Sequence, residues 1–199
     1  MVDKPKIGIF GGSFDPIHIG HLALANYICE IEKLDELWFM LTPQNPLKEE
    51  KAGPTEEQRF ELLQLAIQDY PRFKASDFEL HLQPPYYTAK TLEALRSQYT
   101  DKEFILIIGS DNWSSFDRWK EPEEIKKNHD ILIYPRTHFP INPSMLPQGV
   151  RLISSPIFEV SSTLIREAFS QGIDLPYFLH PEVYKTIKEK GLYLQQKSV

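Results

Sequence analysis

A single cysteine, Cys29, occurs among the 199 residues of this chain, which excludes an intrachain disulfide framework and a metal site built from several cysteines. The longest apolar runs stay well short of the roughly 18 residues that cross a membrane. The formal net charge is −6, so the chain lacks the broad positive field that attracts a nucleic-acid backbone. A signal-peptide segment is also missing from the start. These absences predict a cytoplasmic protein that binds neither membranes nor nucleic acids, with Cys29 in its core.

Two common nucleotide-binding signatures are absent as well. The sequence contains neither the GxxxxGK[ST] pattern of P-loop proteins nor the GxGxxG pattern of dinucleotide-binding folds, so it carries the phosphate chemistry of neither class. With 41% hydrophobic and 25% charged residues, its composition is ordinary for a globular protein. The length fits one domain. We therefore expect residues 1–199 to form a single domain with a small helical part at about 174–194.

Apolar strand-like runs alternate with helix-periodic segments along the chain. The pattern predicts strands at residues 6–10, 36–41, 73–82, 104–108, 129–134 and 151–154. It predicts helices at residues 20–34, 55–69, 87–99, 122–128 and 162–171, a further helix after Gly109, and a last one between Pro181 and Gly191. This alternation favours an α/β fold, a Rossmann-like, doubly wound and mostly parallel sheet with helices on both faces.

The strongest functional signal is the sequence GGSFDPIHIGH at residues 11–21. It lies between an apolar run and an apolar-periodic stretch, which is the context of a strand, a turn and a helix. Small residues let a phosphate approach backbone N–H groups, and the helix directs its positive end to the same place. Alone, a Gly-Gly turn or a histidine near a helix start is more often structural. Joined in this context, with His18 and His21 flanking the helix start, the pieces predict a polyphosphate site.

This motif resembles the T/HxGH signature of the nucleotidyltransferase α/β-phosphodiesterase superfamily, and its GGSFDPxHxGH form resembles that of the bacterial nicotinate-nucleotide adenylyltransferases. A second segment, VSSTLIR at residues 160–166, resembles the ISSTxIR motif that the same family places beside the ATP phosphates. Ser162 and Arg166 are four residues apart and share a helix face. For this segment alone, a serine cap and a surface arginine are the alternative. The resemblance extends over residues 7–193.

Two further groups of residues carry weaker signals. Gly109 and Asp111 follow a buried strand at the carboxyl edge of the sheet, where open α/β folds bind ligands, although Asp111 could equally cap its helix. Lys48 and Arg136 could each contact a phosphate or remain surface charges. The family often has a histidine before the lysine, and Leu47 stands there in this chain, which removes one donor.

Aromatic residues near a helix start resemble the family's subsite for the pyridine ring. Tyr87 and Trp119 could stack on that ring, and Thr88, a plausible N-cap, begins a helix whose N–H groups could bind a carboxylate. Because helix N-termini favour negative charge, this arrangement would explain a preference for the acid over the amide. Core packing of the two aromatic residues is the alternative.

The resemblance implies transfer of the adenylyl group of ATP to nicotinate mononucleotide, giving deamido-NAD and pyrophosphate in NAD biosynthesis. The attacking phosphate monoester is already mostly ionised near pH 7, because its second pKa is about 6, and it needs no general base. The enzyme mainly aligns two anions and stabilises charge on the transferred group. We expect Mg²⁺ to arrive with ATP, and no metal site built by the protein alone.

The resemblance also implies a role for individual residues. The catalytic residues are expected to be His18, His21 and Arg166. ATP binding is assigned to Gly11, Gly12, Phe14, His18, His21, Gly109, Asp111, Ser162, Thr163 and Arg166. Mononucleotide binding is assigned to Gly12, Ser13, Phe14, Lys48, Tyr87, Thr88, Trp119 and Arg136.

Other functions compete with this one. A related adenylyltransferase could act on nicotinamide mononucleotide or on phosphopantetheine, but the latter has no planar ring to use the aromatic residues. A nucleotide- or RNA-binding module could keep the fold without turnover. Class I aminoacyl-tRNA synthetases share a similar histidine motif but are longer and use a KMSKS loop, which this sequence lacks. The oligomeric state is open, a homo-oligomer included.

Overall fold

The structure, a computed structural model, describes residues 4–43 and 53–194. Within this part of the chain, six strands form one sheet in which all neighbours are parallel. The strands are β1 (Lys6–Gly12), β2 (Glu36–Leu41), β3 (Phe73–Ser76), β4 (Glu103–Gly109), β5 (Ile131–Tyr134) and β6 (Val150–Leu152). Their order is β3-β2-β1-β4-β5-β6. The predicted doubly wound sheet is confirmed, and its order reverses between β1 and β4, where such folds bind ligands.

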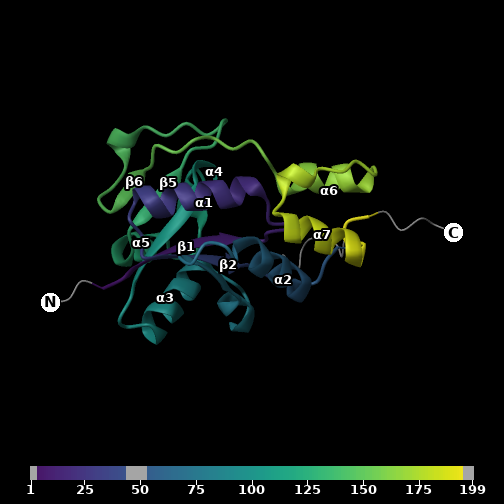
Figure 1. The fold of residues 1–199 in the computed structure, drawn as a ribbon. Coiled ribbons are helices and arrows are strands. Elements are labelled where there is room, and N and C mark those ends of the chain that lie inside the picture. The colour runs from purple at the N-terminus through teal and green to yellow at the C-terminus, as the bar shows by residue number, and fades with distance from the viewer. Residues whose placement is uncertain (1–3, 44–52, 195–199) are drawn as a thin grey trace.

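Helices cover both faces of the sheet, as predicted; α1 and α3 lie on opposite sides of it in Figure 1. The helices are α1 (Ile19–Ile31), α2 (Glu56–Ile67), α3 (Thr88–Gln98), α4 (Ser110–Trp113), α5 (Pro122–Asn128), α6 (Ser162–Ser170) and α7 (Pro181–Lys190). One hydrophobic cluster joins the sheet to α1, α2, α6 and α7, and a second joins it to α3 and α5.

The alternation of side chains along β4 explains these two clusters. Phe104, Leu106 and Ile108 belong to the cluster under α3 and α5, whereas Ile105 and Ile107 belong to the cluster under α1. Successive strand residues point to opposite faces, so a continuous apolar run is required when both faces are covered. Cys29 on α1 is fully buried in the core, which confirms its predicted place.

Three local predictions were wrong. The strand expected at 73–82 ends at Ser76, which pairs with Met40 of β2, and a short 3₁₀ helix, η1 (Phe78–His81), follows it. Thr88 does not cap α3: it is the first helical residue and Tyr87 precedes it as the N-cap. The strand expected at 6–10 extends to Gly12, because Gly11 and Gly12 still pair with β2.

The C-terminal helices pack against the same core as α1. Val183 and Ile187 of α7 are fully buried, and Tyr184 lies 6.4 Å from Phe169 of α6, measured between ring centroids. Figure 1 shows α6 and α7 side by side beyond the end of the sheet. This packing brings Tyr193, after α7, next to the loop that follows β1. No helix in the described parts of the chain is long and apolar enough to span a bilayer.

Candidate active site

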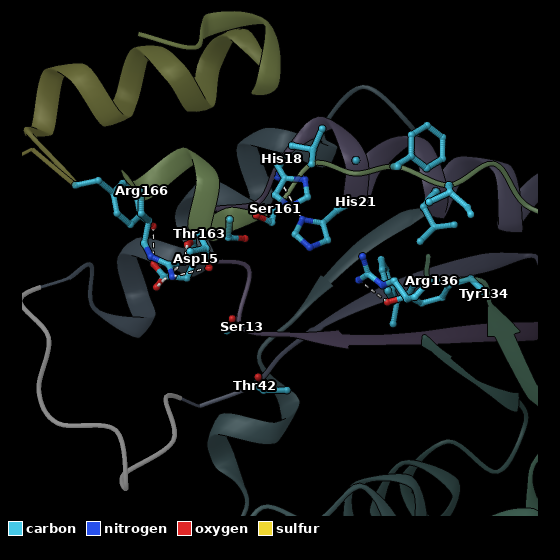
Figure 2. Close-up of a pocket in the computed structure, with 18 of the residues that line it drawn as sticks. Ser13, Asp15, His18, His21, Thr42, Tyr134, Arg136, Ser161, Thr163 and Arg166 are labelled. Atoms are coloured by element: carbon cyan, nitrogen blue, oxygen red, sulfur yellow. Dashed lines mark hydrogen bonds and ion pairs between the residues drawn. The ribbon is translucent and has the colours of Figure 1, made fainter. Parts of the chain in front are cut away.

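A large cavity of about 910 Å³ opens where β1 ends, and Figure 2 shows its side chains. Its polar lining comes from the loop after β1, the start of α1, the ends of β2 and β5, α6 with the segment that enters it, and the chain after α7. These residues include Ser13, Asp15, His18, His21, Thr42, Tyr134, Arg136, Ser161, Ser162, Thr163, Arg166 and Tyr193. The two motifs that stand far apart in the sequence therefore share one cavity.

Hydrogen bonds tie the α6 motif to the loop after β1. Ser162 Oγ donates to the carbonyl oxygen of Pro16 at 2.9 Å, and Arg166 Nη1 donates to that of Asp15 at 2.6 Å. Ser161 is the N-cap of α6, and its hydroxyl accepts from the Leu164 N–H. The hydroxyl proton of Ser162 is therefore engaged by the loop rather than free for a phosphate.

His18 and His21 form a stacked pair at the start of α1. Their ring centroids lie 3.6 Å apart, and the His18 backbone N–H donates to His21 Nδ1 at 3.3 Å. This bond assigns the His21 ring proton to Nε2. Burial, with a smaller contribution from Arg136, lowers the pKa of His18 to about 4. Burial, then His18 and Arg136, lowers the pKa of His21 well below its usual 6.5. Both rings are thus neutral near pH 7, and His21 offers a neutral N–H donor.

Neighbouring residues hold this pair in place. A Cβ at Gly20 would lie 3.1 Å from His18 Nδ1, so the glycine of the motif makes room for the His18 ring. Phe14 is fully buried, and its ring packs edge-on against His21 at 5.2 Å between centroids. Its φ of 43° lies in the left-handed region, which non-glycine residues seldom adopt. The Phe14 side chain therefore supports His21, and only its backbone can serve the phosphate contact expected of it.

Arg136 lines the large cavity opposite the α6 motif (Figure 2). Its Nη2 donates to Tyr134 Oη at 3.2 Å, and its Nε lies 3.9 Å from Asp111 Oδ1. Asp111 itself does not line the large cavity, and it does not cap α4, whose N-cap is Gly109. A side chain at Gly109 would overlap the Asp111 carboxylate, so this glycine allows Asp111 to fold back toward Arg136.

A small cavity of about 270 Å³ adjoins the large one, and Thr42 and Tyr134 line both. Its other lining residues include Gly11, Gly12, Met40, Glu79, Thr88, Thr91, Asn112 and Trp119. Thr88 and Trp119 thus meet in one cavity, whereas Tyr87 lies outside it with 40% of its surface exposed. Gly11 and Gly12, the first two glycines of the motif, line this small cavity, whereas Ser13 and Gly20 line the large one.

Glu79 is the acidic residue of the small cavity. Only 6% of its surface is exposed, and its Oε1 accepts a hydrogen bond from Thr91 Oγ1 at 2.7 Å. Burial raises the pKa of this carboxyl group, and the bond from Thr91 opposes that effect. An ionised Glu79 would repel a bound carboxylate, so the direction of this shift favours an acidic ligand.

Several residues that organise the site were not predicted. Asp15 belongs to the first motif, but its role depends on Tyr193, which lies 178 positions later in the sequence. The Tyr193 hydroxyl donates a hydrogen bond to Asp15 Oδ1 at 2.7 Å. Arg59 and Glu79 stand in ordinary amphipathic segments with no local signal. Lys48, expected to contact a phosphate, lies outside the described residues.

The donor set of the large cavity does not fit a metal held by the protein. The carboxylate of Asp15 accepts from Tyr193 and lies 3.8 Å from Arg166 Nη1, so its charge is already compensated. Among residues 4–43 and 53–194, no three histidine, cysteine or acidic side chains gather in a way that could hold an ion.

The all-parallel sheet of this order, with a histidine pair at the start of the helix that follows its first strand, has the architecture of a nucleotidyltransferase. The model of the cytidylyltransferase-like family matches residues 9–168. A protein of Bacteroides fragilis named probable nicotinate-nucleotide adenylyltransferase is 59% identical over 184 residues, 92% of each chain. A protein of the same name from Flavobacterium psychrophilum is 42% identical over 190 residues, covering 94% of this chain and 98% of its own. This chain belongs to the cytidylyltransferase-like family and, within it, to the nicotinate-nucleotide adenylyltransferases.

Solved structures agree on the fold. The nicotinic acid mononucleotide adenylyltransferase of Plasmodium falciparum complexed with APC matches with a TM-score of 0.77, over 96% of this chain and 98% of that chain. The sequence identity is 24%, so the likeness establishes the nucleotidyltransferase architecture and nothing about individual side chains.

Proposed function

We propose that this chain transfers the adenylyl group of ATP to nicotinate mononucleotide in NAD biosynthesis. A phosphate oxygen of the mononucleotide attacks the α-phosphorus of ATP, the bond from that phosphorus to the β-phosphate bridging oxygen breaks, and deamido-NAD and pyrophosphate form. The observation that carries the proposal is the joining of the two motifs around one cavity by Ser162 and Arg166. The relatives' names support the same reaction.

The two cavities suggest where each substrate binds. We assign the pyridine ring to the small cavity, where Trp119 offers an aromatic face and Thr88 begins a helix whose N–H groups attract a carboxylate. The phosphates would cross the end of β1 into the large cavity. His21 and Arg136 then face the triphosphate, and Thr163 and Arg166 the departing pyrophosphate. Gly109 and Asp111 would contribute by orienting Arg136 rather than by direct contact.

The residues stabilise charge rather than move protons. A dianionic phosphate is already a competent nucleophile, and pyrophosphate leaves as a stable anion. Neutral His21 can donate its Nε2–H to a phosphate oxygen, and the Arg136 guanidinium adds positive charge without a proton transfer. Such preorganised donors cost no reorganisation during the reaction. We propose that Mg²⁺ enters bound to ATP, and that the reaction takes place in the cytoplasm, where ATP is supplied.

The direct test is pyrophosphate release from ATP with nicotinate mononucleotide, with the amide analogue, and with each alone. We expect release with the acid to exceed release with the amide. Equal or greater release with the amide would favour the nicotinamide enzyme, and no release with either would favour a binding module. A chelator should abolish release yet leave the melting temperature of the free protein unchanged, because the described residues offer no metal cage. A lowered melting temperature would reveal a resident ion.

A further inference from the structure

Arg59, on α2, has the largest fully buried side chain of the described residues, with 2% of its surface exposed. A buried guanidinium is costly unless hydrogen bonds compensate its lost hydration. Its Nη1 donates to the carbonyl oxygen of Ser13 at 2.5 Å and to that of Thr42 at 3.2 Å. Both acceptors belong to residues that line the large cavity, whereas Arg59 does not line it. The arginine therefore holds the wall of the phosphate site from behind.

The Ser13 carbonyl fixes the orientation of the next amide. In a trans peptide unit, the C=O of one residue and the N–H of the next point in opposite directions. Because Arg59 binds the Ser13 carbonyl, it fixes the plane of the Ser13–Phe14 peptide and with it the direction of the Phe14 N–H, which points away from Arg59. The left-handed φ of 43° at Phe14 needs such external support, since strained backbone persists only where its surroundings fix it.

The same pattern recurs along the loop. Arg59 binds the carbonyl of Ser13, Arg166 binds that of Asp15, and Ser162 binds that of Pro16. Three side chains from α2 and α6 thus occupy the loop's carbonyl oxygens, which would otherwise repel a phosphate. What remains for an anion is the N–H side of the loop.

Arg59 also brings positive charge close to this wall. Its Nη2 lies 3.9 Å from Glu56 Oε1, and the Glu56 side chain is 45% exposed, so solvent screens the carboxylate more than the buried guanidinium. A buried charge in a poorly polarisable environment acts over a longer range than a surface charge. The guanidinium therefore adds attraction for phosphate beyond its two hydrogen bonds.

We propose that Arg59 is a positioning residue for the phosphate site. Arg59 holds the Ser13–Phe14 peptide with its N–H toward the cavity. Through the Phe14 ring, which packs against His21, it also fixes the position of the His21 ring. This inference deepens the proposed adenylyl transfer and rests on it for the kinetic readout, but the orientation of the peptide can be tested without any turnover.

The experiment compares Arg59→Met and Arg59→Lys with the wild type. Arg72→Met is the matched control, because Arg72 Nη1 also donates to a backbone carbonyl, that of Leu34 at 3.2 Å, away from both cavities. We expect Arg59→Met to lower kcat/KM about a hundredfold, the size of effect produced by misplacing a reacting group by about 1 Å. Arg59→Lys, which keeps the charge but not the two-carbonyl geometry, should recover part of that loss. Arg72→Met should change kcat and KM by less than about twofold.

Amide chemical shifts distinguish a positioning role from a purely structural one, because loss of stability alone would not change the response of the Phe14 amide to a bound anion. Titrating ¹⁵N-labelled protein with inorganic pyrophosphate should shift the Phe14 amide in the wild type and in Arg72→Met, and much less in Arg59→Lys. If Arg59→Met does not fold, Arg59→Lys carries the test alone. The proposal would be overturned by a folded Arg59 variant that has wild-type kinetics and whose Phe14 amide responds to pyrophosphate as strongly as that of the wild type.

The two proposals fail in different ways. A wild-type protein that binds pyrophosphate at Phe14 but forms no dinucleotide would refute the adenylyl transfer and leave the role of Arg59 standing. Full turnover in Arg59→Lys and Arg59→Met would refute the role of Arg59 and leave the adenylyl transfer standing.

Discussion

The two cavities at the end of β1 are built in different ways. The large cavity depends on contacts across the chain: Arg166 and Tyr193 reach Asp15 from 151 and 178 positions away. The small cavity is formed mainly by strand ends and by the start of α3, with Glu79 and Trp119 added from short connections. The comparison teaches that the large cavity is assembled by long-range tertiary contacts, whereas the small cavity lies where neighbouring elements of the fold meet.

The largest expected effect tests the large cavity. His21→Ala should lower kcat about a hundred- to a thousandfold, the range seen when one preorganised donor to a reacting anion is removed. The KM for the mononucleotide should change little if its ring binds in the other cavity. Steady-state kinetics with each substrate varied in turn checks both statements.

His21→Asn is the matched control for stability, because the asparagine oxygen can replace Nδ1 as acceptor of the His18 N–H while removing the Nε2 donor. We expect it to melt closer to the wild type than His21→Ala and to be equally inactive. Wild-type turnover in either variant would end the assignment of His21 to the phosphates.

Acid should destabilise the folded protein through the two histidines of the large cavity, because the pKa of His21 is also lowered and acts with the same sign as that of His18. The pKa of His18 falls from 6.5 to about 4 in the folded protein, so below pH 6.5 the unfolded chain binds a proton that the folded chain does not. Stability is therefore full above pH 6.5 and is lost as the pH falls toward 4, by on the order of 3 kcal/mol. Chemical denaturation at several pH values measures this loss, and His18→Asn should flatten the slope.

Glu79 in the small cavity changes the stability of the folded protein with pH in the opposite direction to His18. Its raised pKa means that the folded protein binds this proton more tightly, so its contribution falls as the pH rises above the usual 4.5. Measuring the effect of His18→Asn on the pH dependence of stability in a Glu79→Gln background removes the contribution of Glu79. A slope unchanged by His18→Asn in that background would show that other groups cause the acid sensitivity.

The smallest expected effect tests whether the small cavity binds the mononucleotide and not ATP. Trp119→Ala should raise the KM for nicotinate mononucleotide about tenfold, the cost of one lost stacking contact, with the KM for ATP unchanged. Trp113→Ala is its control, because Trp113 and Trp119 both pack on Phe116, at 4.9 and 5.0 Å between ring centroids, but only Trp119 lines the cavity. Equal kinetic effects of the two substitutions would place the pyridine ring elsewhere.

Much of the fold was predictable because its signals are local. The apolar run of β4 predicted a strand buried on both faces, and Pro122, Pro181 and Gly191 marked helix ends that the structure confirms. The strand that begins at Phe73 was predicted too long, because its pairing with β2 ends at Ser76 while the alternating pattern of its own residues continues.

The candidate site divides in the same way. The motif predicted a phosphate loop and a histidine pair, and it resembled a family whose second motif completes the site. The proton placement on His21 comes from the His18 N–H within the motif. The lowered pKa values of both histidines depend on burial and on Arg136, which the motif does not contain. Arg59 and Glu79 carried no signal at all, since an arginine or glutamate in an amphipathic segment is normally a solvated residue.

The sequence by itself determined which segments become strands and helices and which residues can meet a phosphate, because periodicity and side-chain chemistry act over a few neighbouring positions. Tertiary structure alone decided that α2, α6 and the chain after α7 converge on the four residues from Ser13 to Pro16. Such contacts join positions 46 to 178 residues apart. They exist only when helix packing and sheet order have placed those elements at one edge, which no local pattern specifies.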